Sequence, residues 1–464
     1  MAKNLIVCCD GTWNKPRDNT NVRRTYEALR RQLQRPTTVL AGSSGGECCT
    51  GAAADGDLVL FYDEGVGTRS AERFTGGAFG AGLSQNVCDA YHFLSQHYAP
   101  GDSIYVFVEA SLDQTGQNTP FIHEDHILFI TNGNEQRVKL VAWGQDAHFF
   151  YPDREIQGLP RFSIIAGLDE AGNTTCETVT WPNDLPYVIY GYAVVDSCST
   201  LIMEPGVRVY VHGGGGLWTY RWGKLNALGT VEEPITFQSD RLEPFYDELP
   251  GQWDRIWIND GPAGGDSELR NVVVKNALVG VQCETWPGLP NAPTSEAWLR
   301  LKNVKIRNCS AAGILSRNFR IDATNLLVGD CGQYSVALTG GGQYRFNHMT
   351  VANYWDFGIR NDPAFIMTNT YAAIDNTLQV RDILESKIEN SIIHGSNTNE
   401  FKLEFNDLDI PEAGDIRFER VLFRTDQSTS GDYFPDQNTI WRNQNPEFVS
   451  VTDRDFHLLV NAFA

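Results

Sequence analysis

The stretch Asn303-Val-Lys-Ile-Arg-Asn-Cys309 returns as Asn325-Leu-Leu-Val-Gly-Asp-Cys331 and again as His348-Met-Thr-Val-Ala-Asn-Tyr354. The sixth residues of the three copies are Asn308, Asp330 and Asn353. The first two are 22 residues apart, and the last two are 23 residues apart. Each copy is a short run of β-forming residues without helical spacing. A fixed period of this size, built from such runs, is typical of stacked coils. The repeat therefore predicts a β-solenoid.

The recurrent polar residue of each copy is expected at a turn between strands. Asparagine and aspartate adopt the left-handed conformation at low cost, and an asparagine there can hydrogen-bond its equivalent one coil away. We predict such a turn ladder at Asn276, Asn308, Asp330 and Asn353. Its role is structural rather than catalytic.

Three regions with different patterns follow one another along the chain, and we predict domains at 1–101, 102–149 and 150–464. The first reads as α/β, because continuous apolar runs alternate with helical spacing. We expect strands at 4–9, 58–62 and 103–108, helices at 21–34 and 82–98, and a loop at 41–57. The second region alternates with a period of two, which indicates three strands of half-buried antiparallel sheet.

Composition excludes several functions. The formal net charge of −21 would repel a phosphate backbone, so nucleic-acid binding is not expected. No apolar run approaches the ~20 residues needed to span a bilayer. The first residues lack a secretory h-region, so the chain as written is expected in the cytoplasm. The ten cysteines show no metal-ligand spacing, and we expect buried or free thiols, with structural zinc as the alternative and no cofactor.

The first 107 residues carry a specific resemblance. Lys3-Asn-Leu-Ile-Val-Cys-Cys-Asp-Gly-Thr-Trp-Asn14, Thr20-Asn-Val22, Tyr62-Asp-Glu-Gly-Val-Gly-Thr68 and Gly76-Gly-Ala-Phe-Gly-Ala-Gly-Leu83 resemble the α/β-hydrolase-like domain of type VI secretion phospholipase effectors. The resemblance implies that a Gly-x-Ser-x-Gly elbow should follow the strand at 103–107. Such an elbow exposes the serine hydroxyl beside backbone donors for the oxyanion.

This chain has Val108-Glu-Ala-Ser-Leu112 at that place. Ser111 has no flanking glycines, and the alternating pattern puts it in a strand. Asp10, Gly11 and Thr12 are interpreted as the remnant of an oxyanion loop, which cannot catalyse alone. A phospholipase-type hydrolase is therefore the least favoured function.

The rest of the chain resembles cell-envelope proteins of Bacteroidetes with right-handed parallel β-helices of the pectin-lyase-like kind. The stretches that carry this resemblance include Asp102-Ser-Ile-Tyr-Val-Phe-Val-Glu109, Val138-Lys-Leu-Val-Ala-Trp-Gly-Gln-Asp-Ala147 and Glu204-Pro-Gly-Val-Arg-Val-Tyr-Val-His212. Residues 102–149 are similar to the second half of an immunoglobulin-like domain. Both resemblances break near residue 101, which we interpret as the junction of a chimera, by accidental or artificial joining rather than natural fusion.

Candidate chemistry on the predicted β-helix is sparse. Trp253 and Trp257 are candidates for stacking on sugar rings. Polysaccharide lyases on this fold pair carboxylates with basic residues, and the pairs Asp240/Arg241 and Asp254/Arg255 have the right types. The cluster His123-Glu124-Asp125-His126 lies before a predicted strand and is interpreted as a solvated turn rather than a metal site.

We therefore expect a mainly β protein: a right-handed parallel β-helix behind a partial immunoglobulin-like sheet and a truncated α/β fragment. The favoured function is a noncatalytic cell-envelope or surface protein with polysaccharide as the candidate partner. The alternative is a polysaccharide lyase or glycoside hydrolase, which would need acid, base and cation to converge in a groove.

Overall fold

The chain divides into two compact units, Met1–Gln114 and Thr115–Ala464, in a computed structural model. The structure describes residues 3–9, 21–41, 46–53, 56–63, 83–108, 121–131, 134–169, 172–285, 293–373, 376–406, 410–412, 415–460 and 462. Each unit is described by itself. No helix among these residues has the length and apolar character required to cross a membrane.

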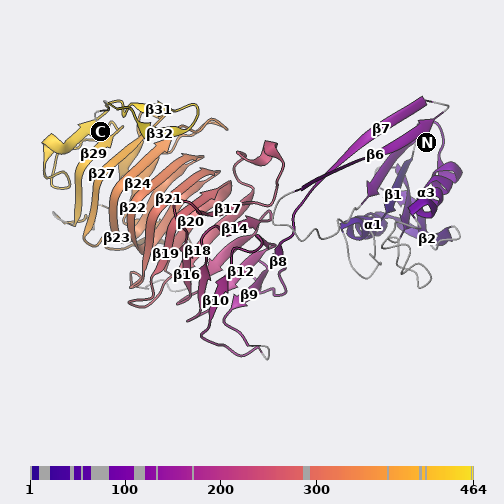
Figure 1. Cartoon of the computed structure of the whole chain (residues 1–464), viewed down its shortest axis with the longest axis horizontal. Helices are drawn as coiled ribbons and strands as arrows, with labels where there is room; N and C mark the ends of the chain where they lie inside the picture. The colour runs from indigo at the N-terminus through magenta and orange to yellow at the C-terminus, as the bar shows by residue number, and fades with distance from the viewer. Residues whose placement is uncertain are drawn as a thin grey trace. The chain divides into compact units, whose positions relative to one another are not determined.

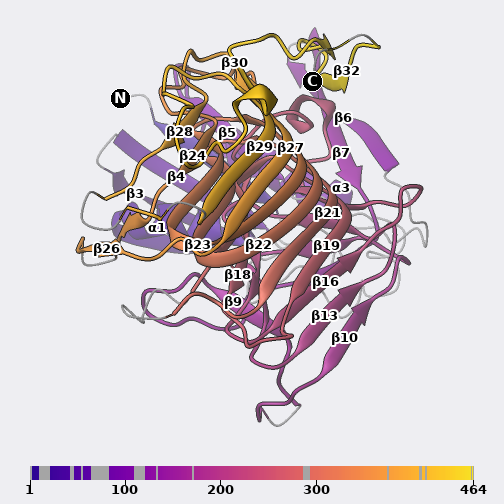
Figure 2. The ribbon, with the colours of Figure 1, turned by 90° about the vertical axis from the view of Figure 1, so that its left-hand side faces the viewer.

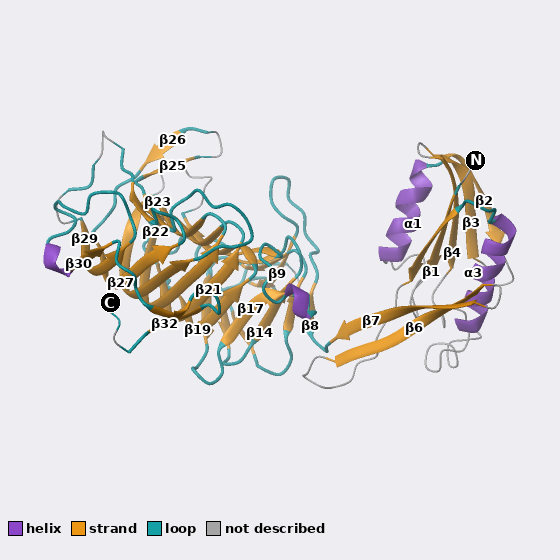
Figure 3. Cartoon of the chain, turned by 90° about the horizontal axis from the view of Figure 1, so that it is seen from above, coloured by secondary structure: helices purple, strands orange, loops and turns teal. Residues whose placement is uncertain are grey.

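The N-terminal unit contains a five-stranded sheet with one helix against each face (Figure 3). Its elements are β1 (Asn4–Cys9), α1 (Asn21–Gln32), β2 (Gln34–Ala41), β3 (Gly46–Ala53), β4 (Gly56–Asp63), α3 (Leu83–His97) and β5 (Ser103–Val108). Strand β1 lies parallel to both β4 and β5. Tyr26 of α1 packs with Ile6 and Tyr62, whereas Phe93 of α3 packs with Val7 on the other face.

The expectation of a loop at 41–57 was wrong. Strand β3 lies within that stretch and pairs antiparallel with both β2 and β4. The stretch is rich in glycine, serine and alanine, which have low strand propensity. The stretch nevertheless forms a strand, because β2 and β4 provide hydrogen-bond partners for its backbone on both sides.

The predicted three-stranded sheet at 102–149 is also corrected. Strand β5 belongs to the N-terminal sheet, because it pairs with β1 in parallel. Strands β6 (Phe121–Thr131) and β7 (Asn134–Gly144) form a separate two-stranded antiparallel hairpin. In the described part of this region, therefore, two strands rather than three are antiparallel.

From His148 onward the strands stack in parallel, and the coils form three columns (Figures 1 and 2). The first column begins with β10 (Thr178–Trp181), β13 (Thr200–Met203), β16 (Lys224–Leu228), β19 (Ser267–Lys275) and β21 (Trp298–Cys309). It continues with parts of β22 (Ala312–Cys331), β23 (Tyr334–Asn353), β27 (Ser386–Gly395) and β29 (Ile416–Phe423).

The second and third columns complete each coil. The second contains β8 (His148–Phe150), β11 (Tyr187–Ile189), β14 (Arg208–Val211), β17 (Ile235–Ser239), the later halves of the long strands, and β30 (Ile440–Arg442). The third contains β9 (Phe162–Ala166), β12 (Tyr192–Val195), β15 (Gly216–Thr219), β18 (Trp253–Asn259), β20 (Ala277–Glu284), the first parts of β22 and β23, β24 (Phe365–Met367) and β28 (Phe401–Leu403). This architecture is a parallel β-helix.

Two short hairpins decorate the coils, β25 (Thr370–Ala372) with β26 (Leu378–Val380) and β31 (Phe448–Ser450) with β32 (Asp455–Leu458).

Aligned apolar side chains fill the interior. In the second column one inward position of each coil lies over the same position of the next coil, and all of these residues are fully buried: Val209, Phe237, Val274, Ile306, Val328, Val351, Ile393 and Phe423. A one-residue slip would turn this whole set outward, so burial fixes the register.

Left-handed residues lie where one strand column passes into the next. Asn276, Asn308 and Asp330 have φ values of 68°, 55° and 50° at the corner before the third column. Their side chains do not form the ladder that we predicted. Asn276 donates to the carbonyl oxygens of Asp247 and Leu249, and Asn308 donates to Glu248.

Asn353 lies at the end of β23 and exchanges two hydrogen bonds with the backbone of Cys331. Asparagine side chains do form a ladder at a different corner, where the first column of strands passes into the second. The side chain of Asn325 donates to Asn303 over 3.0 Å, and Asn303 donates to Asn271 over 3.1 Å.

One disulfide crosslinks two neighbouring coils, between Cys176 and Cys198. The expectation of thiols alone was therefore wrong for this pair. The signal was present in the sequence, because the separation of 22 residues equals the repeat period. Cys309 and Cys331, also 22 residues apart and in register, are buried thiols.

A buried ion pair secures the late coils. The side chains of Arg360 and Glu400 are 2% and 0% exposed and form a two-pronged contact, with Nη1 2.7 Å from Oε2. Glu400 also accepts hydrogen bonds from the backbone of Ala364 and Asn397, while Arg360 donates to the carbonyl oxygens of Asp362 and Asn353. The pair therefore ties two connecting loops to the body of the β-helix.

We predict that Glu400→Gln lowers the free energy of unfolding by about 3–5 kcal/mol, because it leaves the Arg360 charge buried without its counter-ion. Urea unfolding followed by fluorescence measures the change. Glu404→Gln is the matched control, since its partner Lys402 and Glu404 are half-exposed and such pairs contribute about 0–1 kcal/mol. Equal losses in the two variants would contradict the assigned role of Glu400.

The β31–β32 hairpin packs on an apolar patch on the outside of the late coils. Phe448 and Phe456 contact Tyr354, and Arg454 lies 3.0 Å from the buried carboxylate of Asp330. Beneath them the hydroxyl of Tyr354 lies 2.8 Å from Nδ1 of His394. Burial, with the charge of Arg424 adding to it, lowers the pKa of His394 to about 4.

In the unfolded chain His394 binds a proton near its ordinary pKa of 6.5, whereas in the folded protein it binds one only near pH 4. The free energy of unfolding should therefore fall as the pH falls from about 6.5 to about 4. We predict a smaller loss over this range in His394→Asn, measured as the urea midpoint at several pH values. His348→Asn, at an exposed site of the same unit, is the control and should keep the wild-type slope. The same slope in His394→Asn as in wild type would refute the assignment.

Candidate functional site

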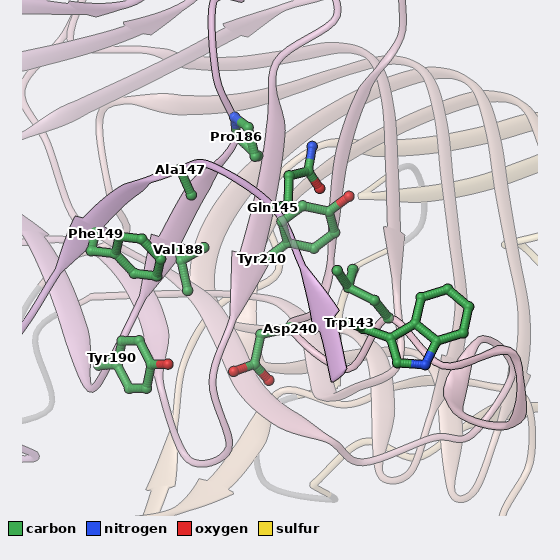
Figure 4. Close-up of a pocket in the computed structure, with 10 residues that line it drawn as sticks. Trp143, Gln145, Ala147, Phe149, Pro186, Val188, Tyr190, Tyr210 and Asp240 are labelled. Carbon is green, nitrogen blue, oxygen red and sulfur yellow. The ribbon is translucent and has the colours of Figure 1, made fainter. Parts of the chain in front are cut away.

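A shallow cavity of about 170 Å³ lies on the outside of the first coils (Figure 4). Its lining residues come from the end of β7, from the segment after it, and from the second column of strands with the residues that flank those strands: Trp143, Gln145, Ala147, Phe149, Pro186, Val188, Tyr190, Tyr210, Asp240 and Leu242. Ligand sites are typically concave, mostly apolar and marked by a few polar groups, and this cavity has that composition.

The floor follows from strand alternation. Val188 pairs in register with Phe149 on one side and with Tyr210 on the other, so the three side chains share the outer face. Their neighbours Tyr187 and Val209 point inward and are buried in the core. Tyr210 is 7% exposed whereas Phe149 is 49% exposed, so the floor is deep at one side and open at the other.

A row of four side chains runs along the edge of the floor, each one residue beyond the end of its strand. The rings of Tyr151 and Tyr190 stack at 4.9 Å, and the Tyr190 ring lies 4.5 Å from that of His212. His212 Nδ1 is 2.7 Å from Oδ2 of Asp240. Burial, with smaller contributions from Asp240 and Tyr151, raises the pKa of Tyr190, so its hydroxyl stays protonated and can donate.

The other end of the cavity is formed by the end of β7 and the segment that leads from it into β8. Figure 4 shows Trp143 and Gln145 on this segment beside Tyr210. The site thus offers aromatic surfaces, an amide and a carboxylate. Glycoside hydrolysis ordinarily needs two carboxyl groups on either side of the bond. Among the described lining residues Asp240 alone supplies one, so the arrangement suits binding better than cleavage.

The two predicted sugar-stacking residues lie elsewhere. Trp253 is 1% exposed in the core, and its Nε1 donates to the carbonyl oxygen of Lys275, so we do not retain it as a sugar-stacking residue. Trp257 is partly buried on the outer face, stacked on Trp218 at 4.7 Å and bonded through Nε1 to Glu284. Sugar stacking at Trp257 stays a prediction.

The two acid–base pairs separate into different environments. Asp240 bonds His212 at the cavity, whereas Arg241 bonds Glu243 at 2.7 Å. Asp254 and Arg255 pair with each other at 2.7 Å, and Asp254 also accepts a hydrogen bond from Tyr192. The pairing occupies Asp254 and Arg255 with each other rather than directing both toward a common groove.

The cluster 123–126 lies in strand β6 and not in a turn, which corrects its predicted position. Glu124 is exposed and pairs with Lys139 at 2.7 Å across the hairpin. The side chains of His123 and Asp125 lie outside the described residues. Among the side chains that are described, no group of three or more His, Cys, Asp or Glu could hold a metal ion.

The predicted remnant of the oxyanion loop and the serine near the expected elbow cannot be placed, since Asp10, Gly11, Thr12 and Ser111 all lie outside the described residues.

Comparison with known families gives a result for the N-terminal end of the chain. Residues 3–107 match the family described as the catalytic domain of Tle1-like phospholipase effectors of type VI secretion. This match supports the hydrolase resemblance and a phospholipase-related origin for the N-terminal unit. No curated protein and no solved structure gave a significant match to the chain.

We predict that the protein has no serine-hydrolase activity, because the matched residues end before Ser111 and no elbow glycines flank this serine. A fluorophosphonate probe should leave Ser111 unlabelled, and phospholipid should not be hydrolysed. Ser111→Ala should give the same background as the wild type. Labelling of Ser111 that disappears in this variant would overturn the prediction.

The sequence pattern did not predict the cavity, because its residues come from the earliest and least regular coils. A signal was nevertheless present. Tyr190 and His212 are 22 residues apart, which is the repeat period, so both had to lie at the same position of adjacent coils.

Proposed function

We propose that this protein is a noncatalytic glycan-binding β-helix of a cell envelope or surface, and that the cavity at Phe149, Tyr190, Tyr210 and Asp240 is its binding site. The observation that carries the proposal is the concave aromatic floor with hydrogen-bonding groups along its edge. Aromatic rings present apolar faces to the C–H surfaces of a sugar, and the edge groups can bond its hydroxyls.

The disulfide supports the proposed location. Disulfides form and persist in oxidising compartments and are rare in the cytosol. The Cys176–Cys198 crosslink therefore favours a place outside the cytoplasm. In this proposal the hydrolase-related N-terminal unit contributes no chemistry.

Binding should depend on the aromatic floor. We predict that Tyr190→Ala and Phe149→Ala each weaken binding of a soluble glycan about fivefold, since a lost aromatic contact costs about 1 kcal/mol. Isothermal titration calorimetry against a panel of neutral, amino and uronic oligosaccharides measures this. Phe245→Ala removes an exposed aromatic ring that does not line the cavity and should leave the affinity unchanged. Failure of every glycan to bind, or equal losses in all three variants, would contradict the proposal.

A further inference from the structure

The charge of the cavity restricts which glycan it can hold. Among the described residues that line it, Asp240 is the one with a formal charge at neutral pH. Its side chain is 17% exposed, and Oδ2 is held by His212. In the described part of the chain its second oxygen, Oδ1, accepts no hydrogen bond, so a carboxylate oxygen remains for a ligand.

This carboxylate lies at the end of a row of stacked rings. The Tyr190 ring lies between those of Tyr151 and His212, and Figure 4 shows Tyr190 and Asp240 among the residues that line the cavity. A cation is attracted to a carboxylate, and partial desolvation of the carboxylate strengthens the attraction. The chain's net charge of −21 adds a long-range field of the same sign.

Resting on the function proposed above, we infer that the cavity selects glycans that carry a protonated amino group, such as oligosaccharides of glucosamine, over neutral and uronic ones. The ammonium bonds Oδ1 of Asp240 at the edge of the aromatic floor. A uronate would place its carboxylate against that of Asp240. Arg208 lies against the hydroxyl of Tyr210, and Arg241, the residue after Asp240, bonds Glu243.

The test compares three oligosaccharides of equal length, made of glucosamine, N-acetylglucosamine and galacturonic acid, by calorimetry on the full chain. Acetylation removes the positive charge and keeps the sugar ring, so the first two form a matched pair. We expect the glucosamine oligomer to bind about tenfold more tightly than the acetylated one, with a preference that shrinks as salt rises.

Asp240→Asn should reduce this preference to about one while retaining binding of the acetylated oligomer. Glu243→Gln is the control, because it removes a neighbouring carboxylate that bonds Arg241 and does not line the cavity. It should keep the tenfold preference. Circular dichroism and the unfolding midpoint check that both variants fold.

The outcomes separate this inference from the proposed function. Equal or tighter binding of the acetylated or the uronic oligomer would overturn the amino-sugar inference and leave glycan binding standing. A preference that survives Asp240→Asn would also overturn it. Binding of none of the three, together with no binding in the wider panel, would remove the proposed function and the inference with it.

Discussion

Every coil of the β-helix depends on the register in which it stacks on the one before. The aligned column from Val209 to Phe423 is buried throughout, and adjacent members are backbone partners in parallel ladders. Because the interior accepts only one face of each strand, a slip of one residue would expose the whole column and bury charged neighbours. The same alternation that points Tyr187 and Val209 inward points Val188 and Tyr210 outward. The floor of the cavity is thus a direct consequence of the core.

The corners between strand columns are where this regular stack receives its irregular additions. Asn276 and Asn308 hold the segment 247–249, and Asp330 lies against Arg454 of the C-terminal hairpin. Burial raises the pKa of Asp330, against the opposing effect of Arg454, which indicates how far these contacts withdraw the carboxylate from water. Polar residues in the left-handed region thus serve two purposes. They turn the chain, and they bind the loops that cover the corner.

The period and the position of the turns could be predicted from sequence because both are local. Asn308 and Asp330 recur at a fixed spacing, and only a few residue types adopt their backbone conformation cheaply. Hydrogen-bond partners could not be predicted, since Asp247 and Glu248 reach the corner from a loop with no repeat. The burial of Trp253 could not be predicted for a related reason. A bulge in the pairing of β18 with β20 shifts the alternation between Arg255 and Ile256, and no sequence pattern marks it.

The cavity illustrates a further limit of sequence reasoning. Asp240 was selected for its type and was paired with Arg241, whereas its partner is His212, 28 residues earlier. That pairing follows from the position of both residues just beyond the ends of stacked strands. Spacing near the repeat period was informative for Tyr190 with His212 and for Cys176 with Cys198. The repeat is regular in the late coils and irregular in the early ones, so the same spacing stands out in the late coils alone.

Covalent mapping of a bound glycan tests the central claim most directly. A glucosamine oligosaccharide that carries a diazirine would be irradiated with the intact chain, and the modified peptides would be identified by mass spectrometry. The account predicts labels within 143–151, 186–190, 208–212 and 238–242, which an excess of unmodified oligosaccharide removes. Competed labels concentrated around Trp257, or within Met1–Gln114, would contradict it.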